Sequence, residues 1–273
     1  MIISSTITEG KSRFSPILFS TNYIEGIRNS KEMGFEGVEL HIRDPKNVDL
    51  DSIKKEISKQ QIKLTAIGTG LSYVDEGLHF TSDNINIRKA AIQRMKDYLD
   101  AFSDLKPMII LGTIKGLLKN ATNIEAAKER MENCIIECCK YAEKLDMEIC
   151  LEAINRYEQD CFNTLAETAQ FIKKVRCNNL YLHIDTFHMN IEEVSFVQPI
   201  FEYKDIIGHI HFADNNRHYP GSGRINFLEI MLSLEKIMYN RAISIECLPI
   251  PDGETAAKRS IQYLKYLKQN LFK

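Results

Sequence analysis

The chain has 273 residues, 44% of them hydrophobic and 26% charged, which is enough apolar content to form a sizeable core. Its formal net charge of -2 gives no overall attraction to nucleic acid or to an anionic membrane surface, so neither is expected as a partner. No apolar run approaches a membrane span, the start MIISSTITEGKSRF lacks the apolar segment of a signal peptide, and the seven cysteines form no CxxC pair. We therefore expect a cytoplasmic protein with reduced thiols.

Eight short runs rich in Ile, Val, Leu and Phe alternate with helix-like stretches. The predicted strands are residues 2–5, 36–42, 62–67, 107–111, 147–152, 179–185, 206–212 and 242–247. Helices are predicted at 85–105, 123–145 and 164–175, where apolar residues recur at three- and four-residue intervals. Such alternation implies parallel strands joined by right-handed crossovers, and eight units predict one (β/α)8 TIM-barrel domain over residues 1–273. A doubly wound sheet is the alternative, but no GxGxxG follows an early strand.

The last four predicted strands each end on a side chain that could bind a metal. ICLE ends on Glu152, YLHID on Asp185, GHIH on His211 and ISIE on Glu246. In a barrel, the carboxyl ends of the strands converge on one pocket. A single Asp or Glu at a strand end is more often a helix cap or a surface residue, but four in succession favour a shared metal site.

The residue types narrow the choice of metal. Three carboxylates and one imidazole form an oxygen-rich site. Such a site suits Mn²⁺, Mg²⁺ or Co²⁺ better than it suits a structural zinc ion, which is usually bound by Cys and His. We expect one divalent ion per chain, with Mn²⁺ first and Co²⁺, Mg²⁺ or Zn²⁺ as alternatives. His183 and His209 lie two residues before Asp185 and His211, deeper on the same side of each strand, and are predicted to be hydrogen-bonded interior histidines.

Several longer motifs resemble a known family. EAINRYE, HIDTFHMNIEE, HIHFADNNRHYPGSGRINF and ISIEC are similar to the sugar isomerase/epimerase group of xylose isomerase-like barrels, above all to the ketose 3-epimerases. The resemblance implies that Glu152, Asp185, His211 and Glu246 hold the metal and that Glu152 and Glu246 also move the proton. It further implies that the residues Glu158, His188 and Arg217 hold the oxygens of the substrate. Homodimers or homotetramers are implied as well.

The first half of the chain departs from that pattern. Members that act on free ketohexoses often line the distal end of the sugar with Trp, and this chain has none. Arg43 follows the second predicted strand and Lys115 follows the fourth, so the two cations could bind a phosphate or carboxylate of the substrate. The alternative is that Arg43 pairs with a neighbouring carboxylate and that Lys115 is solvated.

The predicted chemistry is a proton transfer beside a carbonyl. A metal that binds a carbonyl oxygen and the neighbouring hydroxyl stabilises an enediolate, and two carboxylates on opposite faces of the carbon can then invert it. Glu152 and Glu246 come from strands three apart, which places them across the pocket from one another and favours epimerisation. The resemblance implies that the inverted centre is C3 of a ketose, either as the free sugar or as a sugar phosphate. One base on one face would give an aldose-ketose isomerase, and loss of water would give a dehydratase of a cyclic ketopolyol. A nuclease of the endonuclease IV type is disfavoured because the third and fourth strands end without His.

Overall fold

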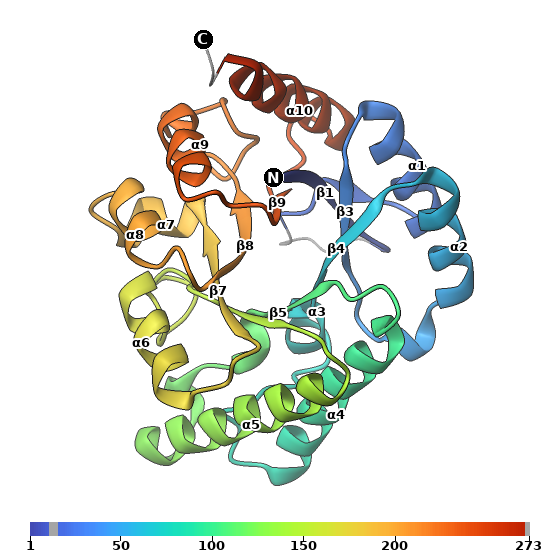
Figure 1. Cartoon of the computed structure of the whole chain (residues 1–273). Coiled ribbons are helices and arrows are strands. Elements are labelled where there is room, and N and C mark those ends of the chain that lie inside the picture. Colours follow the sequence, from blue (N-terminus) through green and yellow to red (C-terminus); the bar gives the residue numbers. More distant parts are fainter. Residues whose placement is uncertain (11–15, 271–273) are drawn as a thin grey trace.

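Eight parallel strands form a closed ring at the centre of the protein, with helices around the outside (Figure 1). The structure is a computed structural model that describes residues 1–10 and 16–270. The barrel strands are β1 (Ile2–Thr8), β3 (Gly37–His41), β4 (Lys63–Gly68), β5 (Met108–Leu111), β6 (Ile149–Glu152), β7 (Leu180–Asp185), β8 (Ile207–Phe212) and β9 (Ala242–Ile245). Each of them coincides with one of the eight predicted strands.

The pairing of the last strand with the first closes the barrel. Ile2 to Ser5 of β1 pair in parallel with Ala242 to Ile245 of β9, while every other strand pairs with its neighbours in chain order. The short strand β2 (Phe19–Ser20) adds to the end of β1. The (β/α)8 prediction is therefore confirmed, and the doubly wound alternative is wrong because an open sheet has two unpaired edges. That residues 1–273 form a single domain stays a prediction.

The helices lie outside the strands and carry most of the crossovers. They are α1 (Tyr23–Met33), α2 (Leu50–Gln60), α3 (Gly70–Val74), α4 (Ile85–Phe102), α5 (Ile124–Lys144), α6 (Leu165–Val175), α7 (Thr186–Glu192), α8 (Val197–Glu202), α9 (Phe227–Lys236) and α10 (Gly253–Asn270). Short 3-10 turns are η1 (Pro45–Asn47), η2 (Thr113–Lys115) and η3 (Leu118–Asn120). Side chains of Asn84, Asn123 and Thr164 cap the three predicted helices by accepting backbone N–H groups of the first turn. Within residues 1–10 and 16–270, no helix is both long and apolar enough to cross a membrane.

The two faces of the strands have different chemistry. Alternate residues such as Leu151 and Ile184 point outward and are buried against the helices in the main apolar core. The residues between them, such as Cys150, Glu152, His183 and Asp185, point into the barrel and are mostly polar near its carboxyl end. The core between sheet and helices therefore stabilises the fold, while the barrel interior is left to carry chemistry.

Candidate active site

The structure brings the four predicted strand-end residues together at the carboxyl end of the barrel. Glu152 ends β6, Asp185 ends β7, His211 lies in β8 directly beside Asp185 in the strand register, and Glu246 follows β9. Ligand atoms of Glu152, Asp185 and His211 all lie within 4.8 Å of one another. Nδ1 of His211 lies 3.3 Å from Oε2 of Glu246. None of the four side chains is more than marginally exposed, so their charges are largely removed from water.

Glu152, His211 and Glu246 line a cavity of about 210 Å³. Its described lining divides into two halves. The second half of the chain contributes Ile154 and most of the titratable groups, namely Glu152, Glu158, His188, His211, Arg217 and Glu246. The earlier part of the chain contributes mainly apolar and backbone surface, namely Pro16, His41, Gly68, Thr69, Gly70, Leu71, Val74, Ile110, Gly112 and Thr113. A small molecule would thus meet charged groups on one side and an apolar wall on the other.

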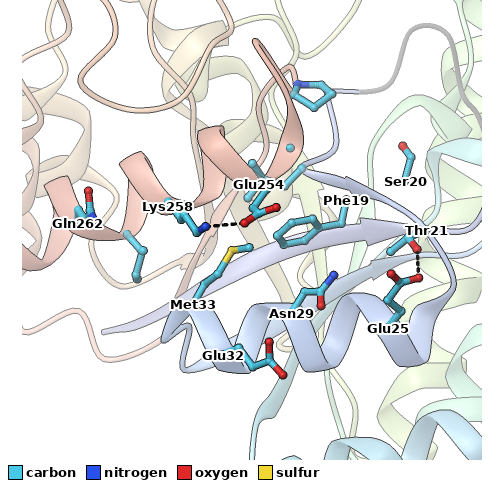
Figure 2. A pocket seen from close by; sticks show the side chains of 14 residues that line it. Phe19, Ser20, Thr21, Glu25, Asn29, Glu32, Met33, Glu254, Lys258 and Gln262 are labelled. Carbon is cyan, nitrogen blue, oxygen red and sulfur yellow. Dashed lines mark hydrogen bonds and ion pairs between the residues drawn. The ribbon is translucent and has the colours of Figure 1, made fainter.

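A larger hollow lies elsewhere, where β2 and the chain beside it face α1 and the start of α10 (Figure 2). Its volume is about 810 Å³. Its polar side chains are mostly exposed and satisfy one another, as Glu254 does with Lys258 and Glu25 with Thr21. No convergent set of buried acids and imidazoles is present among its described lining residues. The smaller cavity is therefore the candidate active site.

Asp185 both caps a helix and faces the active site, two roles that were alternatives in the sequence analysis. Its Oδ1 accepts the backbone N–H of Phe187 at 2.8 Å and so caps α7. Its Oδ2 faces the cavity side, where Nη1 of Arg217 lies at 2.6 Å and Nε2 of His188 at 3.8 Å. The helix cap fixes the orientation of the carboxylate and leaves the second oxygen available for chemistry.

Room for the Glu152 carboxylate depends on a glycine in the neighbouring strand loop. A Cβ atom placed on Gly112 would lie 2.6 Å from Oε2 of Glu152, closer than real Cβ contacts allow. Any larger residue at this position would push the carboxylate aside. The position of Glu152 is thus determined by a residue that follows β5 as well as by its own strand.

The residue His211 presents one ring nitrogen to the site and anchors the other. Its Nε2 lies 3.0 and 3.1 Å from the two carboxylate oxygens of Glu39, a fully buried residue of β3. Its Nδ1 is buried without a hydrogen-bond partner among the described residues and faces Asp185 and Glu246. A carboxylate on one nitrogen and an unpaired second nitrogen among acids is the arrangement that metal-bound histidines show. The residues present therefore fit a divalent metal ion.

Arg217 balances part of the negative charge of the site. One guanidinium nitrogen contacts Asp185, another contacts Glu246, and the group stacks 4.8 Å above the ring of Phe187. The loop that carries Arg217 is held by Asp214, whose carboxylate accepts the backbone N–H groups of four residues, Asn215, Gly221, Gly223 and Ile225. The guanidinium is thereby oriented before any substrate arrives.

His188 and Glu158 lie on the same wall of the cavity and share one supporting residue. The side-chain amide of Asn155 donates to Nδ1 of His188 at 2.7 Å and to Oε1 of Glu158 at 2.9 Å. With Nδ1 occupied as an acceptor, Nε2 of His188 carries the ring proton and points toward Glu152 and Asp185, 3.8 Å from each. This nitrogen can donate a hydrogen bond to an oxygen placed between the two acids.

The two glutamates are electrostatically unequal. Burial, followed by the charge of Glu246, raises the pKa of Glu152 to about 8. Burial also raises the pKa of Glu246, but the positive charges of His211 and Arg217 outweigh it and leave that pKa below its usual value. Within this arrangement Glu152 favours the protonated form near neutral pH and Glu246 favours the ionised form, the two states that an acid and a base require. A bound cation would oppose this increase and lower the pKa of Glu152.

The predicted anion site does not form in the structure. Arg43 pairs with Asp75 and is absent from the described lining of the cavity. Lys115 is fully buried and donates from Nζ to the backbone carbonyl of Glu152 at 2.8 Å, so the alternative that it is solvated is also wrong. Both residues follow their strands as predicted, so their side chains could have met at the mouth of the barrel. Instead, the side chain of Lys115 turns behind β6 and that of Arg43 turns toward α3. The geometry therefore argues against a role for either cation in binding a phosphate.

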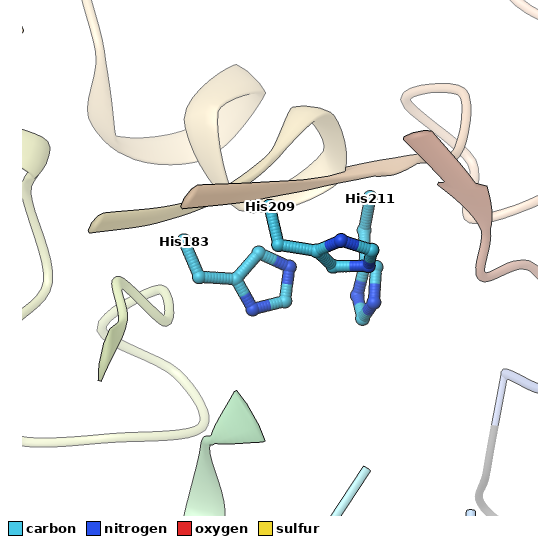
Figure 3. A group of neighbouring side chains, drawn as sticks. All are labelled: His183, His209 and His211. Atoms are coloured by element: carbon cyan, nitrogen blue, oxygen red, sulfur yellow. The ribbon is translucent and has the colours of Figure 1, made fainter. Parts of the chain in front are cut away.

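Three histidines of β7 and β8 lie close together inside the barrel, namely His183, His209 and His211 (Figure 3). The rings of His183 and His211 pack edge to face with centroids 4.1 Å apart. Nε2 of His209 contacts Glu39 at 2.8 Å and Ser244 at 3.1 Å, which agrees with the predicted hydrogen-bonded interior histidine. His183 is buried in the interior as predicted, but the predicted hydrogen bonding is wrong, because neither ring nitrogen has a partner among the described residues.

Three residues of the site escaped the sequence prediction. Glu39 and His41 in β3 and Asn155 after β6 support or line the cavity. A signal for the first pair was present, because Glu39 and His41 are polar residues two apart on an otherwise apolar strand, the same pattern as His183 with Asp185. The role of Asn155 depends on loop geometry and has no comparable signal.

Comparisons with known proteins agree with this geometry. Residues 27–267 match the family model described as the xylose isomerase-like TIM barrel. The chain is 31% identical to the D-psicose 3-epimerase of Agrobacterium fabrum over 87% of this chain and 80% of that protein. It is 24% identical to the 3-dehydro-D-guloside 4-epimerase of Escherichia coli over 90% of this chain and 95% of that protein. A solved structure of an L-ribulose 3-epimerase superposes with a TM-score of 0.85 at 21% identity, over 99% of this chain and 95% of that chain.

Proposed function

The chain belongs to the xylose isomerase-like TIM barrel family, and we propose that it is a metal-dependent sugar epimerase that inverts C3 of a ketose. Glu152 and Glu246 serve as the acid and base. The observation that carries the proposal is the pair of buried carboxylates, from strands three apart, that line one cavity. The names of the relatives support a sugar as the substrate.

The metal would be held by Glu152, Asp185, His211 and Glu246. Support comes from the chemistry of the donor set and from the unpaired Nδ1 of His211, which has no other partner among the described residues. Three carboxylates and one imidazole favour Mn²⁺, with Co²⁺, Mg²⁺ or Zn²⁺ as alternatives. When bound, a divalent ion supplies Lewis acidity that makes the hydrogen on C3 of a ketose easier to remove.

The residues of this chain then divide the proton transfer between two faces. Glu246, whose pKa lies below its usual value, is the base that removes the proton from one face of C3. Glu152 returns a proton to the opposite face, and the roles reverse for the opposite epimer. The Nε2–H group of His188, the guanidinium of Arg217 and the carboxylate of Glu158 hold the substrate oxygens. The substrate is then fixed while the proton moves.

The decisive experiment follows deuterium from solvent into the sugar. The purified protein is incubated with Mn²⁺ in D₂O and tested by NMR against D-fructose, D-psicose and L-ribulose, with a 3-keto glycoside added because one relative is a 4-epimerase. Epimer formation with deuterium at the inverted carbon would support the proposal. No conversion and no exchange with any ketose would contradict it.

Two variants separate the two-base mechanism from its alternatives. Glu152→Gln and Glu246→Gln should each lower the rate of inversion by at least about 100-fold. Each variant should still exchange the hydrogen on C3 from one face, through the glutamate that remains. If one variant is inert and the other turns over normally, a single base acts, and an aldose-ketose isomerase or a dehydratase replaces the epimerase. Glu56→Gln, a remote glutamate paired with Arg28, is the matched control.

A further inference from the structure

On the apolar half of the cavity, one ring nitrogen has no hydrogen-bond partner among the described residues. On this half the hydroxyl of Thr69 donates to the carbonyl of Ile110 at 2.7 Å, and the hydroxyl of Thr113 is directed at the carbonyl of Gly70 at 3.4 Å. Both hydroxyl protons are therefore already committed to the backbone. The described residues of this wall also include a histidine, His41, which lies at the end of β3.

The ring of His41 is held at two points. Its Nε2 lies 2.7 Å from Oε1 of Glu39, the same carboxylate that anchors His211. Its Nδ1 lies over Gly68, where a Cβ atom would come within 2.4 Å of it. Both His41 and Gly68 line the cavity, so the ring lies in space that only glycine leaves open. One carboxylate thus orients an imidazole on each side of the barrel.

This orientation fixes which kind of hydrogen bond His41 can make. A carboxylate accepts and cannot donate, so the proton of the neutral ring is on Nε2 and Nδ1 presents a lone pair. No hydrogen bond to Nδ1 occurs among the described residues. A lone pair can accept from a hydroxyl group, whereas a phosphate or carboxylate oxygen has no proton to give. The negative charges of Glu39 and of Glu246, whose Oε1 lies 3.9 Å from Nε2 of His41, further disfavour an anion here.

We propose that His41 forms a hydroxyl-binding subsite that selects neutral ketoses over their phosphorylated forms. Nδ1 accepts a hydrogen bond from a hydroxyl on C4, C5 or C6, the carbons beyond the reacting end of the sugar. The inference rests on the proposed function, because the reacting end must lie at Glu152 and Glu246 for the rest of the chain to reach this wall. In this proposal the far end of the sugar is bound by a neutral hydrogen-bond acceptor on His41, and not by the cationic phosphate site predicted from Arg43 and Lys115.

Two isosteric variants separate the two ring nitrogens. Asn reproduces the position of Nδ1, and Gln reproduces that of Nε2, so His41→Gln keeps the contact with Glu39 and loses the acceptor in the cavity. With D-fructose and Mn²⁺, His41→Gln and His41→Leu should raise KM about tenfold, and His41→Asn should raise it less than about threefold. The turnover number should change less than KM, because the hydroxyl is bound equally in the ground and transition states. His79→Gln changes a histidine absent from the described cavity lining and serves as the control.

Substrate analogues identify the hydroxyl group. Among 4-, 5- and 6-deoxy-D-fructose, one should have the same KM with wild type and with His41→Gln, because the interaction is already missing. D-Fructose 6-phosphate should be a poorer substrate than D-fructose for wild type. Gly68→Ala, which displaces the ring without removing it, should repeat the KM increase of His41→Gln and guards against a folding defect in the His41 variants.

The outcomes distinguish this inference from the proposed function. If wild type converts D-fructose and the KM values of His41→Gln and His41→Leu equal that of wild type, the subsite is refuted and the epimerase remains. A preference of wild type for the phosphate ester would also refute it. If wild type neither converts nor exchanges any ketose, the proposed function and the subsite fall together.

Discussion

Replacing Glu39 by Gln should weaken metal binding although Glu39 is outside the proposed ligand set. Nε2 of His211 lies about equally far from both oxygens of Glu39, at 3.0 and 3.1 Å. In the Gln variant, one of these positions becomes an NH₂ group whichever way the amide is turned. That group repels the Nε2–H of His211 and favours the tautomer with its proton on Nδ1, the nitrogen that faces Asp185 and Glu246. A protonated Nδ1 cannot bind a metal.

The expected loss is a factor of about 10 to 100 in Mn²⁺ affinity, or about 1.4 to 2.7 kcal/mol, the usual effect of removing a supporting carboxylate. Burial lowers the pKa of His211, but the charges of Glu39 and Glu246 raise it well above its usual value. Loss of the Glu39 charge therefore also makes the imidazole of His211 less basic and a weaker ligand for the metal.

The assay is a titration with Mn²⁺ at pH 8, followed by electron paramagnetic resonance of the free ion. Glu56→Gln removes a remote carboxylate that pairs with Arg28 and controls for the lost negative charge. A thermal melt checks that both variants are folded. Mn²⁺ affinity within twofold of wild type in a folded Glu39→Gln protein would refute the reasoning.

Two other substitutions test the surroundings of the site. Asp214→Ala removes the acceptor of four backbone N–H groups in the Arg217 loop, so steady-state kinetics should show KM for D-fructose rising at least about tenfold, and an unchanged KM would contradict this role. Lys115→Met concerns stability. Burial lowers the pKa of Lys115 in the folded protein below the usual 10.5. Between these two pKa values the unfolded chain binds more protons than the folded chain, so the contribution of Lys115 to the free energy of unfolding increases as pH rises. Urea unfolding from about pH 8 to about pH 10 should show a smaller gain for Lys115→Met than for wild type, and equal gains would contradict the assignment.

The barrel could be predicted because its signal is local. The eight strands carry runs of Ile, Val and Leu and are separated by amphipathic stretches with their own caps, such as Asn123 before α5 and Thr164 before α6. Each of these patterns acts over a few residues, and the number of units then determines a closed ring. The strand-end positions of Glu152, Asp185, His211 and Glu246 follow from the same local register.

The direction of long side chains could not be predicted in the same way. Lys115 and Arg43 follow their strands as expected, yet one is buried behind β6 and the other pairs with Asp75. Both side chains have several rotatable bonds and reach partners that the chain brings near only after folding. The support of His188 by Asn155 likewise depends on a loop contact across 33 residues.

The sequence by itself determined the barrel and the three acids and one imidazole at its carboxyl end, because strand periodicity and strand ends are encoded within each segment. Only the tertiary structure decided that Glu39 anchors both His41 and His211, that Nδ1 of His211 is the nitrogen left free, and that Glu152 and Glu246 differ in proton affinity. These properties depend on distances between strands up to 172 residues apart in the chain and on the exclusion of water from between them. Closure of the ring creates both conditions.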